Sequence, residues 1–131
     1  MIFVDTSVWF AAYVEEEPEH AHADALLTTP GDRLVTTDYI VDELLTLLIA
    51  HEQRPIAIAL GRLLWSRALC EIVWVSKSDV EAAWKVFDTF ENKTWSFTDC
   101  VSYAVMKRLA IDKALALDEH FKQFGFVAVQ P

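Results

Sequence analysis

A helix that carries an acidic residue in its first turn is predicted by the stretch Trp95-Ser96-Phe97-Thr98-Asp99-Cys100-Val101-Ser102-Tyr103-Ala104. Ser96 suits the N-cap, because its hydroxyl can accept a hydrogen bond from a backbone N–H that has no partner inside the helix. Asp99 follows three residues later, where a carboxylate can close a capping box, and the helix dipole favours its ionised form. Capping alone would explain Asp99, so a chemical role requires further acids that the fold brings to it.

The composition indicates one compact domain over residues 1–131. The chain is long enough to bury a core, and with 53% hydrophobic residues, 3 Gly and 4 Pro it is neither disordered nor rich in linkers. Cys70 and Cys100 lie in apolar helical contexts, which favours buried thiols in a reducing compartment over a disulfide scaffold. No basic segment precedes the first apolar run, and no apolar run reaches the roughly 18 residues of a membrane span. We therefore expect a cytoplasmic protein without membrane contact.

The net charge of −9 limits the classes of partner. An acidic surface repels phosphates, which argues against a simple nucleic-acid-binding module. It does not argue against an enzyme that approaches phosphates through bound divalent cations, because the cations invert the local sign of the charge. The charge is equally compatible with a basic protein partner.

Short apolar runs alternate with helical patterns along the chain. The predicted strands are 2–4, 34–36, 72–75, 114–117 and 126–129. The predicted helices extend from Thr6-Ser7 to about Tyr13, Pro18 to about Leu27, Asp38 to about His51, Arg54 to about Leu69, Ser78 to about Phe90, Ser96 to about Met106, and His120 to about Phe124. The sequence also predicts a second capping box at Ser78–Glu81, a turn at Pro30–Asp32 and a helix stop at Gly125. This alternation predicts an α/β fold, a three-layer α/β/α sandwich around a mainly parallel sheet of about five strands.

Two further acids follow predicted strands. Asp5 ends the first strand and Asp118 ends the fourth, and parallel sheets bind ligands outside the carboxyl ends of their strands. Asp99 begins the helix that leads to the strand before Asp118, so we expect it near the opposite sheet edge. The polar loop before Ser96 must then bring the helix start across to the other acids.

Glu43 is the fourth candidate. It borders the apolar arc of its helix, one turn after Ile40 and one turn before Leu47, whereas Asp42 points to the other side. A carboxylate at a packing edge is unfavourable unless it is paired or metal-bound, although a side chain that reaches water is equally expected for this helix alone. Converging acids require a cation between them, and oxygen-only ligands favour Mg²⁺ or Mn²⁺ over zinc.

The chain resembles the PIN domain and, more closely, the VapC-type toxins of bacterial and archaeal toxin–antitoxin pairs. The resemblance extends over essentially the whole chain and is carried by Asp5-Thr6-Ser7, Glu43 in a Leu-rich helix, Ser96-Phe97-Thr98-Asp99-Cys100, and Leu117-Asp118-Glu119-His120-Phe121. It implies a metal-dependent endoribonuclease in which cation-activated water cleaves RNA phosphodiester bonds. The implied partners are an RNA substrate, a cognate antitoxin and a second copy of the chain in a homodimer.

The resemblance also implies the site residues. The implied catalytic residues and ligands of Mg²⁺ or Mn²⁺ are Asp5, Glu43, Asp99 and Asp118, and the implied supporting residues are Thr6, Ser7 and Ser96. In the family the start of the last long helix does reach the pocket. Ala116 departs from many relatives, which carry a hydroxyl residue beside the last acid, and this leaves open what supports Asp118.

Other functions fit the residues less well. A phosphatase with Asp5 as nucleophile would need a second acid two residues on, where Ser7 stands, and a receiver-type phosphorylation switch would need a lysine where Asp118 stands. A non-catalytic binding or scaffold module with this fold stays open, and metal affinity would distinguish it from an enzyme. Trp9 and Phe10 are candidates for a dimer or antitoxin surface, and His120 either contacts substrate or packs at a helix start.

Overall fold

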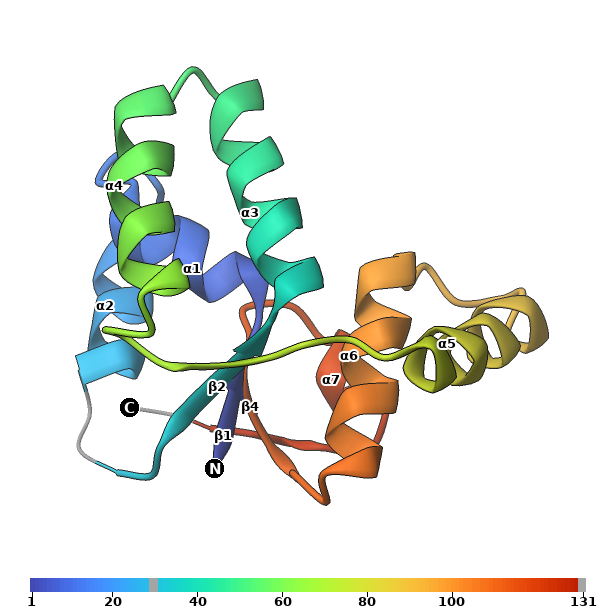
Figure 1. Ribbon diagram of the computed structural model, residues 1–131. Helices are drawn as coiled ribbons and strands as arrows, with labels where there is room; N and C mark the ends of the chain where they lie inside the picture. Colours follow the sequence, from blue (N-terminus) through green and yellow to red (C-terminus); the bar gives the residue numbers. More distant parts are fainter. Residues whose placement is uncertain (29–30, 130–131) are drawn as a thin grey trace.

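A parallel sheet forms the middle layer of the computed structural model, which describes residues 1–28 and 31–129 (Figure 1). Its strands are β1 (Ile2–Val4), β2 (Leu34–Thr37), β3 (Glu71–Val73), β4 (Lys113–Leu115) and β5 (Val127–Ala128). Their order is β3-β2-β1-β4-β5, and every neighbouring pair is parallel. In the central strand, Phe3 pairs with Val35 of β2 and Ala114 of β4. The predicted fold class is confirmed.

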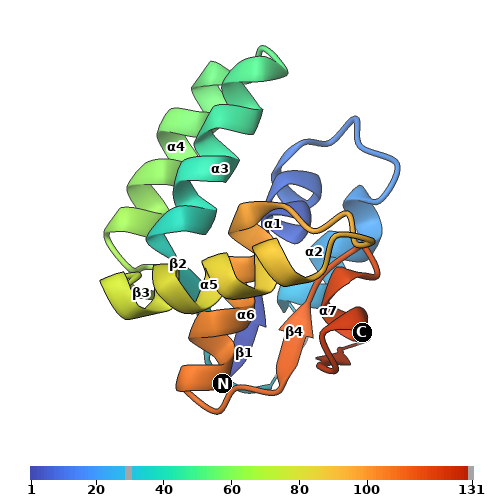
Figure 2. The ribbon, with the colours of Figure 1, turned by 90° about the vertical axis from the view of Figure 1, so that its right-hand side faces the viewer.

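Helices cover both faces of this sheet. They are α1 (Thr6–Tyr13), α2 (His20–Thr28), α3 (Asp38–Ala50), α4 (Arg54–Trp65), α5 (Lys77–Thr89), α6 (Phe97–Arg108) and α7 (His120–Gln123). The chain moves outward from β1 to β3 and then returns past β1 to β4, so right-handed crossovers place α1–α4 on one face and α5–α7 on the other (Figure 1). Figure 2 shows α5 lying across α6 as an outer layer. Within the described residues, no helix combines the length and apolar character that a bilayer crossing needs.

Helix α1 lies in the middle of the main core. It packs against both α2 and α3, so it is apolar on more than one side. Trp9 is 1% exposed and Phe10 is 7% exposed, and both belong to the main cluster of buried apolar side chains. The prediction that these two residues form part of a partner surface is therefore wrong. Cys70 and Cys100 are free and buried, as predicted.

Two helices begin at a cap one residue earlier than predicted. The N-cap of α1 is Asp5, whose backbone is extended and whose carboxylate accepts a hydrogen bond from the Ser7 N–H, rather than Thr6 or Ser7. The N-cap of α3 is Thr37 rather than Asp38, because the Thr37 hydroxyl accepts from the Ile40 N–H. The Asp38 carboxylate instead accepts a hydrogen bond from Val75 N, at 2.8 Å. Asp5 is therefore itself the cap of α1, whereas Asp38 binds a partner outside the start of α3.

The start of α5 also differs from the prediction. Its capping box is formed by Ser76 and Asp79, not by Ser78 and Glu81. The preceding strand β3 accordingly ends at Val73 rather than at residue 75.

Other boundaries differ by a few residues. Helix α2 begins at His20 rather than Pro18, and α4 ends at Trp65 rather than Leu69, just before Arg67 with a φ of 61°. Strand β4 ends at Leu115 and β5 covers only residues 127–128, so both are shorter than predicted. Gly125 follows α7 with a φ of 94°, a conformation that favours glycine, and stops the helix as predicted. Pro30 of the predicted turn lies outside the described residues.

Candidate functional site

Asp5 occupies the carboxyl end of the central strand and is 3% exposed. Its Oδ2 accepts hydrogen bonds from Ser7, at 2.7 Å from the hydroxyl and 3.3 Å from the backbone N. The Ser7 hydroxyl in turn accepts a hydrogen bond from Leu117 N at 3.1 Å, which joins α1 to the segment that carries Asp118. Burial, and then the neighbouring charges of Asp118 and Asp99, raise the pKa of Asp5 to about 7 against the opposing Ser7 hydrogen bonds. Asp5 is thus a buried carboxyl group close to two others.

Asp99 reaches this group from the start of α6. The predicted capping box is present: Ser96 N donates to Asp99 Oδ2 at 3.0 Å, and Asp99 N donates to the Ser96 hydroxyl at 3.0 Å. The expectation that Asp99 lies near the opposite sheet edge is wrong, because α6 runs back along the sheet and ends just before the start of β4, which leaves its first turn at the carboxyl ends of the strands. Asp99 is there close enough to Asp5 for its charge to contribute to the raised pKa of Asp5.

Asp118 lies three residues beyond the end of β4 rather than directly after it. Its Oδ1 accepts a hydrogen bond from His120 N at 3.0 Å, which supplies support that Ala116 cannot. The His120 ring lies between two acids, with Nδ1 2.7 Å from Asp99 Oδ2 and 3.7 Å from Asp118 Oδ1. The sequence did not identify His120 as a partner of these acids, and its spacing two residues after Asp118 was the available signal.

Glu43 joins the site through α1. Its side chain is partly exposed, as expected for the edge of the apolar face of α3, while Asp42 is exposed. Thr6 Oγ1 donates to Glu43 Oε1 at 2.5 Å, so the residue after Asp5 holds the acid of a different helix. Glu43 and Thr98 also line a groove of about 380 Å³ between α3 and the start of α6. Thr98, the residue before Asp99, thus forms part of the wall of this groove.

The donor set suits a hard divalent cation. Within residues 1–28 and 31–129, no Lys or Arg forms an ion pair with Asp5, Glu43, Asp99 or Asp118. The acceptor atoms of all four side chains are carboxylate oxygens, which Mg²⁺ and Mn²⁺ favour. In this same part of the chain, no three His, Cys, Asp or Glu side chains are grouped closely enough to hold a metal ion. The acids therefore form an open arrangement that would have to contract around a cation.

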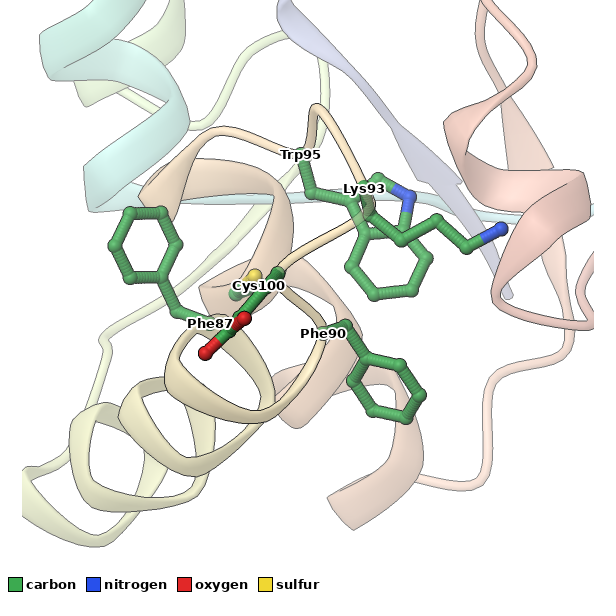
Figure 3. A pocket seen from close by; sticks show the side chains of 6 residues that line it. Phe87, Phe90, Lys93, Trp95 and Cys100 are labelled. Carbon is green, nitrogen blue, oxygen red and sulfur yellow. The ribbon is translucent and has the colours of Figure 1, made fainter.

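A separate pocket of about 160 Å³ lies behind the start of α6 (Figure 3). Phe87 of α5 and Phe90, the residue after α5, line it together with Lys93, Trp95 and Cys100, and none of the candidate acids does so. Burial, and then the charge of Asp99, raises the pKa of Cys100 to about 11, so its thiol is a poor nucleophile at neutral pH. This pocket belongs to the packing between α5 and α6 and is separate from the four candidate acids.

Comparison with known proteins gives one consistent result. The PIN domain family model matches residues 2–127. The chain is 31% identical over 131 residues to the 23S rRNA-specific endonuclease VapC20 of Mycobacterium tuberculosis, from strains CDC 1551 and H37Rv, covering 100% of this chain and 99% of that protein. It is also similar to the crystal structure of Mycobacterium tuberculosis VapC20, described as a sarcin–ricin loop cleaving toxin, with a TM-score of 0.94, 30% identity and complete coverage of both chains. The resemblance found in the sequence is confirmed. The chain belongs to the PIN domain family and is homologous to the VapC20 toxin endonuclease.

Proposed function

We propose that this protein is an endoribonuclease that requires Mg²⁺ or Mn²⁺ and acts as the toxin of a toxin–antitoxin pair. The observation that carries the proposal is that Asp99 and Asp118 approach the buried Asp5 at the carboxyl end of β1 closely enough for their charges to help raise its pKa to about 7. Such a group is electrostatically unfavourable unless a cation joins it. The full-length similarity to an rRNA endonuclease supports the same activity.

The residues of the proposed site have two roles, to bind the cation and to orient the acids that bind it. Asp5, Asp99, Asp118 and Glu43 would hold the cation, Ser7 orients Asp5, and Thr6 orients Glu43. When bound, a divalent cation would offset the repulsion among the carboxylates and lower the pKa of the water that attacks phosphorus. The resemblance to the family implies a 5′-phosphate and a 3′-hydroxyl as the products. The raised pKa of Asp5 makes protons compete with the cation below about pH 7.

Ribosomal RNA is the first substrate class to test. The relative is named as specific for 23S rRNA and matches this chain from end to end. With a net charge of −9 the protein has no general attraction for phosphates, so affinity for RNA has to arise locally, at the cation site and at contacts with the bases.

Exposed aromatic side chains support protein partners, namely a cognate antitoxin and a second copy of the chain. Trp65 and Trp74 stack with their ring centroids 5.8 Å apart, and Trp74 is 66% exposed. The exposed Trp84 and Phe87 of α5 form a second cluster with the half-buried Phe97 of α6. Aromatic residues are enriched in protein interfaces, and these clusters replace the buried Trp9 and Phe10 as candidate contacts.

Cleavage of RNA by the purified protein tests the proposal. Ribosomal RNA and a mixed structured RNA pool are incubated with the wild type in Mg²⁺, in Mn²⁺ and with a chelator, and with the Asp99→Asn variant. We expect cutting that requires a divalent cation and disappears in the variant. Cleavage that continues with the chelator would refute the metal requirement. No cleavage together with no Mn²⁺ binding in calorimetry would favour the scaffold function, and binding without cleavage would indicate a substrate absent from the pool.

A further inference from the structure

One imidazole connects two acids that come from different elements. Asp99 belongs to the first turn of α6, Asp118 follows β4, and His120 begins α7. His120 Nδ1 lies 2.7 Å from Asp99 Oδ2, across a separation of 21 residues, and its backbone N donates to Asp118 Oδ1 at 3.0 Å. An ionised carboxylate can only accept hydrogen bonds, so Nδ1 is the donor to Asp99. The same residue therefore contacts both acids through separate donors.

Other contacts already hold α7 in place. Trp95 Nε1 donates to Gln123 Oε1 at 2.9 Å, and the Trp95 ring lies over Phe124 with a centroid distance of 4.2 Å. Phe121 is also buried in the main core. These contacts fix the short helix without help from the imidazole. The hydrogen bond from His120 is therefore not needed to dock α7, and it can position the Asp99 carboxylate instead.

Apart from His120, the residues that the structure describes give the Asp99 carboxylate one hydrogen-bond donor, Ser96 N of the capping box. That bond directs the carboxylate back toward its own helix start. His120 supplies the second donor to the same oxygen, from the side on which Asp118 lies. Donors behind metal-binding side chains commonly fix the orientation of those side chains.

We propose that His120 is a positioning residue that holds the Asp99 carboxylate toward Asp118 and so sets the spacing of the acids that receive a divalent cation. The inference rests on the proposed function only in requiring that the acids bind a cation. Its consequence is that metal affinity depends on the donor at the place of Nδ1 rather than on an aromatic ring. Leucine removes the donor while filling the space, and asparagine carries an amide nitrogen the same number of bonds from Cα.

Calorimetric titration of the metal-free protein with Mn²⁺ alone tests this, beside thermal unfolding of each variant. We expect His120→Leu to weaken Mn²⁺ binding by about 10- to 100-fold, and His120→Asn to recover most of the affinity. The matched control is His20→Leu, because the part-buried His20 uses its Nδ1 at 2.8 Å from the Ala11 carbonyl oxygen, away from the acids. This control is expected to bind Mn²⁺ as the wild type does.

The arms of the experiment separate the two proposals. If the wild type binds no Mn²⁺, the proposed function itself is wrong. If the wild type binds and His120→Leu binds equally well, only the positioning role is wrong, and the same holds if His120→Asn loses as much affinity as His120→Leu. Should the leucine variant fail to fold, His120→Ala takes its place in the same comparison with His120→Asn.

Discussion

Helices α5 and α6 begin with the same capping box, but the acid of each box has different partners. In α5 the Ser76 hydroxyl accepts from Asp79 N at 3.1 Å and Asp79 accepts from Ser76 N at 2.9 Å. In α6, Ser96 and Asp99 form the same two bonds at 3.0 Å each. Asp79 is 3% exposed and Asp99 is 7% exposed, so burial does not distinguish them either. The capping boxes of α5 and α6 therefore have the same spacing and the same hydrogen bonds, and their acids are similarly buried.

The difference lies in what faces each carboxylate. Arg108, at the far end of α6, binds Asp79 with two hydrogen bonds, Nε to Oδ1 at 2.8 Å and a terminal guanidinium nitrogen to Oδ2 at 2.9 Å. The guanidinium lowers the pKa of Asp79 and leaves little capacity for another ligand. Asp99 faces His120 and the acids Asp5 and Asp118 instead. A capping acid thus becomes structural or available for a cation according to its partner from outside the motif.

The largest contrast is expected between Asp99→Asn and Asp79→Asn. Asparagine keeps a capping oxygen at both positions, so both variants should fold. Asp99→Asn should lower the cleavage rate by more than about 100-fold, since even replacements behind a ligand cost about 10- to 100-fold. Asp79→Asn should leave cleavage near the wild-type rate but reduce the free energy of unfolding by about 1–2 kcal/mol, a value discounted because Arg108 is 41% exposed.

Initial cleavage rates and urea unfolding of the two variants measure this contrast. Equal loss of cleavage in both variants at equal stability would contradict it, because the acids would then not differ in function.

The second largest contrast is expected in the pH dependence of stability, which Asp5 and Asp79 should change in opposite directions. The pKa of Asp5 is raised from 3.8 to about 7, so the native state binds this proton more tightly than the unfolded state does. The metal-free protein should therefore lose stability as the pH rises through this range, by on the order of 2–3 kcal/mol between pH 5 and 8. The lowered pKa of Asp79 has the opposite effect: its stabilisation is present above pH 3.8 and is lost as the pH falls further.

Thermal unfolding from pH 3 to pH 8 measures both effects. Asp5→Asn should remove the decline toward pH 8 and retain the loss at low pH, whereas Asp79→Asn should do the reverse. Added Mn²⁺ should restore the wild type at pH 8 by binding the native state. An Asp5→Asn variant with the wild-type slope between pH 5 and 8 would show that the proton does not reside on Asp5.

Local patterns were sufficient for the elements but not for every boundary. Apolar runs and helical periodicity located the strands and helices, because a buried strand is a short apolar run and a helix buried on one face repeats its apolar residues every three to four positions. The start of α5 was misplaced because Ser76 with Asp79 and Ser78 with Glu81 have the same spacing. The choice between them is tertiary: the Asp38 carboxylate binds Val75 N, which fits an extended chain up to the cap at Ser76.

The candidate acids could be nominated from the sequence, but the way in which the fold brings them together could not. Asp5, Asp99 and Asp118 could each be nominated from positions at strand and helix ends. Their approach depends on β4 lying beside β1, a pairing between distant segments that no local pattern records. His120 was missed as a partner of Asp99 for the same reason, since the contact spans 21 residues and requires α7 to be docked. The metal and catalytic roles of the acids stay predictions.

The smallest contrast concerns the two cap hydroxyls. Ser76→Ala and Ser96→Ala each remove one hydrogen bond to a helix-start N–H and should each lower the free energy of unfolding by about 1 kcal/mol. Only Ser96→Ala should also weaken cleavage, by a few-fold, because it loosens the turn that carries Asp99, while Ser96 N still supports the carboxylate. Urea unfolding and cleavage rates measured side by side provide the check. If Ser76→Ala slowed cleavage as much as Ser96→Ala, activity would follow the stability of the α5–α6 layer, and the distinction between the two capping boxes would have no functional content.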